Sequence, residues 1–71
     1  MNHSKVWEES KARIKTSQPQ HAYSTWFDPI RSIGLNENEL VLEVPNQFFF
    51  EWIQSHYKET IKDEVEAVYR G

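Results

Sequence analysis

The side chains of this chain that could carry out chemistry are histidines, scattered carboxylates and serines. His3, His21 and His56 stand far apart and have no cysteine beside them, so their spacing is not that of a metal site. Ser17 and Ser24 lack a neighbouring His/Asp pattern that would activate a hydroxyl as a nucleophile. We therefore expect no catalytic residue, no metal site and no enzyme.

The sequence also contains no glycine-rich motif for binding phosphate groups or nucleotide cofactors. The glycines are Gly34 and Gly71, which excludes a P-loop or a Rossmann fingerprint in this chain. We expect no cofactor to bind here. A net charge of −3 argues against strong non-specific binding to nucleic acid.

The aromatic residues are the remaining candidates for function, and aromatic side chains serve in binding. Three phenylalanines follow Asn46, and on a helix they point about 100° apart, so they cannot all face one core. A helical wheel places Phe49 and Phe50 on an apolar side, with Trp52 at its margin. Phe48 falls on the opposite, charged side, where it either packs against a neighbouring element or stays exposed for a partner.

The elements that must position these residues can be read from caps, turns and periodicity. Asn46 is a good helix N-cap after Pro45, where a strand should end. Alternating Leu40, Leu42 and Val44 predict a strand with one buried face. The predicted order is a helix over 4–16, a helix from Pro19 to about 28, strands over 30–35 and 40–44 joined by a turn at 36–39, and one helix over 47–69.

The first predicted helix has a thin apolar stripe. Ser4 is a plausible N-cap, and Trp7 and Ile14 lie on one side that Lys11 interrupts. We expect this helix to dock loosely. Lys11 also belongs to a cluster with Arg13 and Lys15, which is either a local basic patch or, as we prefer, a solvated face balanced by neighbouring glutamates.

Seventy-one residues make one small domain, over residues 1–71, with a modest core. The chain has no cysteine, which fits a reducing compartment. It has no apolar run long enough to span a membrane and no signal-peptide pattern. We expect a cytoplasmic protein without membrane contact.

The order and spacing of the aromatic residues resemble those of one known family, the N-terminal domain (domain I) of the bacterial chromosomal replication initiator DnaA. The matching residues are Trp7, Thr25-Trp26-Phe27 before Pro29, the block Val44-Pro45-Asn46-Gln47-Phe48, then Glu51-Trp52-Ile53 and Tyr57. The resemblance covers nearly the whole chain. It implies a small KH-like α/β (α+β) fold, in which a third strand usually follows the last helix and would here be truncated.

The resemblance also implies that the chain is a fragment of a longer initiator. A linker, an ATP-binding AAA+ domain and a DNA-binding domain would follow, so ATP and magnesium are expected only there. In the family this domain self-associates, contacts the replicative DNA helicase and receives regulatory proteins.

Specific residues inherit expectations from the family. Trp7 matches the self-association residue, and Thr25, Trp26, Asn46 and Phe48 match a surface for the helicase and regulators. Phe48 also matches a position linked to weak single-stranded DNA binding. The chain departs from the family at two positions: Ala22 stands where some members carry an acidic residue for helicase contact, and Lys11 stands where a leucine is usual.

Three hypotheses follow. The first is a protein-interaction module of a replication initiator. The second is a weak single-stranded nucleic-acid-binding KH-like module, which lacks the GxxG loop of binding KH domains but could stack bases on Phe48 or Trp52. The third is a domain without a partner, which composition alone does not exclude.

Overall fold

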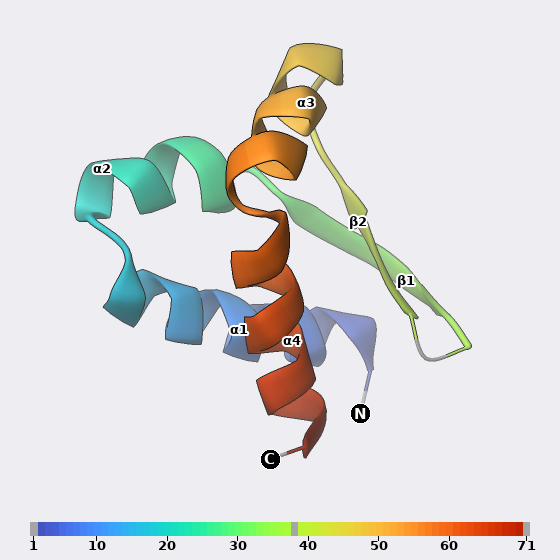
Figure 1. Ribbon diagram of the computed structural model, residues 1–71. Helices are drawn as coiled ribbons and strands as arrows, with labels where there is room; N and C mark the ends of the chain where they lie inside the picture. Colours follow the sequence, from blue (N-terminus) through green and yellow to red (C-terminus); the bar gives the residue numbers. More distant parts are fainter. Residues whose placement is uncertain (1, 38, 71) are drawn as a thin grey trace.

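The computed structural model describes residues 2–37 and 39–70, and Figure 1 shows helices arranged around one side of a β-hairpin. The elements are α1 (His3–Ser17), α2 (Gln20–Ala22), the π-helix η1 (Tyr23–Phe27), β1 (Arg31–Asn36), β2 (Glu39–Glu43), α3 (Gln47–His56) and α4 (Lys58–Arg70). This is an α+β fold in the predicted order helix, helix, strand, strand, helix, with the last helical stretch divided in two.

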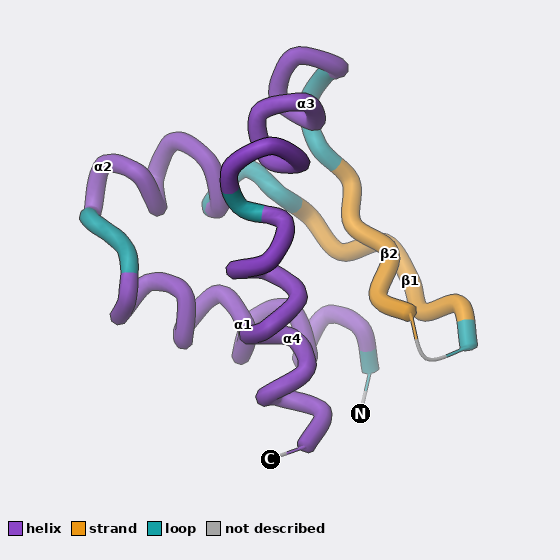
Figure 2. Tube along the Cα trace, in the orientation of Figure 1, coloured by secondary structure: helices purple, strands orange, loops and turns teal. Residues whose placement is uncertain are grey.

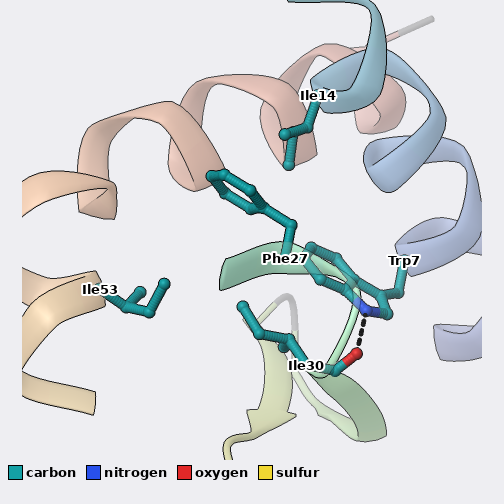
Figure 3. Packing of buried hydrophobic residues seen from close by; sticks show 5 residues of the cluster. All are labelled: Trp7, Ile14, Phe27, Ile30 and Ile53. Carbon is teal, nitrogen blue, oxygen red and sulfur yellow. Dashed lines mark hydrogen bonds between the residues drawn. The ribbon is translucent and has the colours of Figure 1, made fainter. Parts of the chain in front are cut away.

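The centre of the core is formed by residues of α1, η1 and α3 together with Ile30, which precedes β1. Figure 3 shows its central cluster, which consists of Trp7, Ile14, Phe27, Ile30 and Ile53. The indole Nε1–H of Trp7 donates a hydrogen bond of 2.9 Å to the backbone carbonyl of Ile30. Because both groups are buried, this bond satisfies a donor and an acceptor that would otherwise be costly to desolvate.

Helix α1 corrects two sequence-based predictions. Its N-cap is Asn2, whose side chain accepts from the Lys5 N–H at 2.8 Å, and Ser4 lies inside the helix. The helix does not dock loosely, because Val6, Trp7 and Ile14 are all buried.

Lys11 does not prevent this packing of α1. Its side chain is mostly covered, and its ammonium group lies 4.0 Å from the Asp28 carboxylate. A lysine can cover apolar surface with its methylene stem while its charged end reaches the surface. The polar residue in the apolar stripe is therefore accommodated without separating α1 from the core.

The second predicted helix contains only a short α-helical part, and the rest of it has the wider turn of a π-helix. Only three residues form α2, with Pro19 at its N-cap, and the next five form η1. The backbone N–H of Asp28 donates to the carbonyl of Tyr23 at 2.9 Å, which is the i to i+5 pattern of a π-helix. The wide turn buries Phe27 fully and leaves Trp26 partly exposed.

The hairpin agrees with the predicted strands within a residue or so at each end. β1 and β2 pair antiparallel, with Asn36 opposite Glu39 at the turn and an irregular register between Ser32 and Gly34. Among the described residues of the turn, Glu37 adopts the left-handed conformation (φ 59°); Asn38 lies outside the described residues. Leu40, Leu42 and Val44 pack toward the core, as their alternation predicted.

The single long helix predicted over 47–69 is wrong. α3 ends at His56, Tyr57 leaves the helical conformation (φ −127°, ψ 4°), and α4 starts at Lys58. Figure 2 shows the short step between the two helices. The segment contains neither glycine nor proline, so we attribute the break to tertiary packing. The Tyr57 and Phe27 rings pack edge-on, with their centroids 4.8 Å apart.

The buried indole gives a stability prediction. Trp7→Phe removes the donor to the Ile30 carbonyl and leaves that oxygen without its partner. We expect the free energy of unfolding, measured by urea denaturation, to fall by about 1–3 kcal/mol. Trp52→Phe is the matched control, because Trp52 is 43% exposed, and it should cost clearly less. Equal losses in the two variants would contradict a structural role for the Trp7 hydrogen bond.

Candidate protein-binding surface

A shallow depression of about 550 Å³ lies between η1 and α3. We call it the aromatic groove. Most of its lining is aromatic, and the lining residues are Trp26, Asn46, Phe48, Phe49, Glu51, Trp52, Ser55 and His56. It therefore joins residues from two segments that are separated in the chain by the whole hairpin.

The wall of the aromatic groove is a stack of rings. Trp26 and Trp52 lie nearly parallel, with centroids 4.9 Å apart and an angle of 11° between their planes. Phe49 lies 5.2 Å from Trp26, and the His56 ring lies 4.1 Å from Trp52. Rings that support one another in this way lose little freedom on binding, so the wall is already formed before any partner arrives.

Asn46 sets the start of α3 and hence the direction of its side chains. Its backbone is extended and its Oδ1 accepts from the Phe49 N–H at 2.8 Å, which confirms the predicted N-cap. From this start, positions 48, 51, 52 and 55 share one helix face by their spacing of three and four. All four of these residues line the aromatic groove.

Phe48 is the most exposed large apolar residue in the described part of the chain. Its side chain is 85% exposed, so the sequence-based alternative of a ring tucked against a neighbouring element does not hold. Trp52, one turn further along α3, is 43% exposed. Together they make an exposed apolar area with a partly polar edge, which is typical of a contact surface.

The charge of the aromatic groove is negative. Glu51 is the one Asp, Glu, Lys or Arg side chain among its described lining residues. The side-chain amide of Gln47 donates to Glu51 Oε2 at 3.2 Å along the exposed face of α3. The carboxylate is thus held at the rim while it remains open to solvent.

The structure brings together three of the four residues predicted for the helicase and regulator surface. Trp26, Asn46 and Phe48 all line the aromatic groove. Thr25 is exposed on η1 next to Trp26 but is not one of the lining residues. Ala22, which stands where some family members carry an acidic residue for helicase contact, is buried.

Trp7 lies elsewhere. It is 3% exposed and belongs to the core cluster, with its indole N–H bonded to Ile30. A contact through its ring would require α1 to move away from that cluster. Self-association through Trp7 remains a prediction.

Trp52, His56 and Glu51 also belong to the aromatic groove, and the sequence did not assign them to the protein-binding surface. A signal was available, because Trp52 and Glu51 follow Phe48 by four and three positions on the same helix. The stacking of the Trp26 ring against these residues could not be predicted, because it depends on how η1 packs against α3.

A second depression lies between the end of α1 and the α2–η1 segment. Its lining includes Lys15, Tyr23 and Asp28. Burial, and secondarily the nearby carboxylate of Asp28, raise the pKa of Tyr23 above its usual value. The Lys15 ammonium lies 5.6 Å from the centre of the Tyr23 ring. These contacts stabilise the helix packing and offer no reactive group.

Over residues 2–37 and 39–70, no group of three or more His, Asp or Glu side chains is arranged to hold a metal ion. None of the helices there has the length and apolar character needed to cross a bilayer.

A small α+β domain whose most distinctive surface is an exposed aromatic groove has the character of an interaction domain. Comparison with known families agrees: residues 4–67 match the model of the DnaA N-terminal domain. The chain belongs to this family, as the sequence resemblance predicted.

Curated relatives support the same assignment. The chain is 42% identical over 57 residues to the chromosomal replication initiator protein DnaA of Flavobacterium psychrophilum, covering 80% of this chain and 12% of the relative. It is 39% identical over 64 residues to that of Chlorobaculum tepidum (90% and 13%). It is 35% identical over 65 residues to that of Thermus thermophilus (92% and 15%). The chain thus spans about an eighth of the length of these relatives.

The N-cap of α3 gives the second prediction. Asn46→Ala removes the acceptor for the Phe49 N–H and should lower the free energy of unfolding by about 1 kcal/mol in urea denaturation. Asn46→Asp keeps a capping oxygen and should retain most of that stability. If both variants lose the same stability, the cap is not what fixes the start of α3.

Proposed function

We propose that this chain is a protein-interaction module of a chromosomal replication initiator, without catalytic activity of its own. The observation that carries the proposal is Phe48, which is 85% exposed at the rim of the preformed aromatic groove. An exposed aromatic ring beside a rigid ring stack is the arrangement that binding anchors use. The family membership of the chain supports a role at the replication origin.

The partners in this proposal are the replicative DNA helicase and the regulatory proteins of the initiator, bound through Trp26, Asn46, Phe48 and the adjacent Thr25. Trp26 and Phe48 contribute apolar area, whereas Asn46 is already engaged as the α3 cap and acts chiefly by placing its neighbours. Weak self-association with other initiator molecules is a separate part of the proposal. It does not depend on the aromatic groove.

Binding of single-stranded DNA is the second candidate, and the ring stack favours it because bases stack on exposed aromatic rings. The electrostatics favour proteins instead. Of the three clustered cations on α1, Lys11 faces Asp28 and Arg13 donates to Glu64 at 2.9 Å. Lys15 lies over the Tyr23 ring, so this cluster is not a free basic patch of the kind that attracts phosphates.

The rest of the initiator's chemistry belongs, in this proposal, to parts that this chain does not include. The relatives are about eight times longer than the aligned region, which leaves room for the AAA+ and DNA-binding domains. ATP and magnesium would bind in the AAA+ domain. The proposed location is the cytoplasm, where the chromosome is replicated.

Phe48→Ala tests the proposal. We expect the free energy of binding to the replicative helicase of the same organism to weaken by about 1–2 kcal/mol, because the variant removes an exposed anchor. Folding should be unaffected, since the ring makes little contact with the core. The measurement is an NMR amide-shift titration, in which shifts of the unaltered chain should cluster at Thr25, Trp26, Asn46 and Phe48.

Ile33→Ala provides the matched control. Ile33 is 55% exposed on the hairpin and does not line the aromatic groove, so its loss should leave helicase affinity unchanged. Amide shifts confined to α1 around Trp7 would show that the helicase binds that helix and not the aromatic groove. An absence of shifts at high helicase concentration would reject helicase recruitment for this chain.

A further inference from the structure

We propose that the aromatic groove is specific for a protein partner that presents a lysine or arginine side chain. In this proposal the partner's cation pairs with the Glu51 carboxylate, and an apolar part of the partner covers the neighbouring Phe48 ring. This inference rests on the proposed function and specifies the chemistry of the partner. Glu51 is the one Asp, Glu, Lys or Arg side chain among the described residues that line the groove, and the His56 ring also belongs to this lining. The fixed charge of the surface is therefore the carboxylate of Glu51.

Glu51 has no basic side chain to pair with in the described residues. The ion pairs within 4.0 Å there are Lys11–Asp28, Arg13–Glu64 and Arg70–Glu66. Glu51 instead accepts a hydrogen bond from the neutral amide of Gln47 through Oε2. The carboxylate therefore has a defined orientation and keeps its negative charge uncompensated, with its other oxygen free for a donor from outside.

The position of Glu51 makes this charge matter for any partner that binds Phe48. The two residues lie three positions apart on α3, which places them side by side on one exposed helix face. A partner that covers the Phe48 ring must therefore approach the Glu51 carboxylate. Covering that carboxylate with apolar atoms would leave a desolvated, unpaired charge, which is strongly unfavourable.

A partner can avoid this penalty by leaving Glu51 in water, by donating neutral hydrogen bonds to it, or by providing a cation that forms a charge-assisted hydrogen bond. Only the cation also neutralises the charge and matches the overall charge of the chain, which is −3. A basic side chain next to an apolar pocket is therefore the complement that this helix face favours, because it adds specificity and faster association to the apolar contact.

The same carboxylate acts against a nucleic acid. A strand whose bases stack on Phe48 or Trp52 would bring its phosphates close to Glu51, and like charges repel. Neutralising Glu51 should thus have opposite effects on the two classes of partner. It should weaken the binding of a basic protein partner and strengthen the binding of single-stranded DNA.

The experiment compares Glu51→Gln and Glu51→Lys with the unaltered chain by fluorescence anisotropy. The probes are the replicative helicase of the same organism and, separately, a labelled oligo-dT strand. We expect Glu51→Gln to weaken helicase binding by about threefold to tenfold and Glu51→Lys by more, with a shallower salt dependence in both. Glu9→Gln is the control, because Glu9 is exposed on α1 and its loss changes the net charge equally.

The outcomes separate this inference from the proposed function. If Phe48→Ala weakens helicase binding while Glu51→Gln changes neither affinity nor salt dependence, the inference fails and the protein-binding function stands. If the unaltered chain does not bind the helicase, both fail. If Glu51→Gln tightens oligo-dT binding and leaves the helicase unaffected, the groove serves nucleic acid and the inference is again rejected. Equal losses in Glu9→Gln would mean that net charge alone is responsible.

Discussion

Phe27 lies where three parts of the chain meet, and its burial determines where the neighbouring Trp26 can point. Its ring is fully buried among Trp7, Ile14, Ile30 and Ile53, and it also meets Tyr57 edge-on at 4.8 Å. With Phe27 anchored at the end of η1, Trp26 lies against the rings of α3. The same residue that closes the core therefore fixes one wall of the aromatic groove.

Two departures from regular helix build this arrangement. The π-helical hydrogen bond from Asp28 to Tyr23 widens the turn before Pro29, and Tyr57 interrupts the last helical stretch. Beyond the interruption, Ile61 and Val65 of α4 pack against the core, while α3 keeps an exposed face. Short π-helical turns often occur at functional sites, and here one carries Thr25 and Trp26.

Local signals in the sequence were sufficient for part of this structure. The cap at Asn46 and the alternation of β2 depend on neighbours in the chain, and both are confirmed. The helical wheel placed Phe48 on the charged side of its helix but left open whether its ring is covered, and the structure leaves it exposed. The π-helix, the break at Tyr57 and the close docking of α1 depend on distant contacts. Lys11, for example, weakens the apolar stripe of α1, yet it reaches Asp28, a residue 17 positions further along that no local pattern connects with it. The groove residues from α3 could be anticipated, but their pairing with Trp26 could not.

The aromatic groove separates the requirements of folding from those of binding. Trp26, Trp52 and Phe49 support one another and hold η1 against α3, so changes to them would alter both the surface and its scaffold. Phe48 and Glu51 project from the same helix into solvent and contribute little to the core. In the proposed function, these are therefore the positions at which a substitution can change binding without a large effect on stability. The ring stack would then supply the wall of the binding surface, and the exposed face of α3 would set its apolar and electrostatic character.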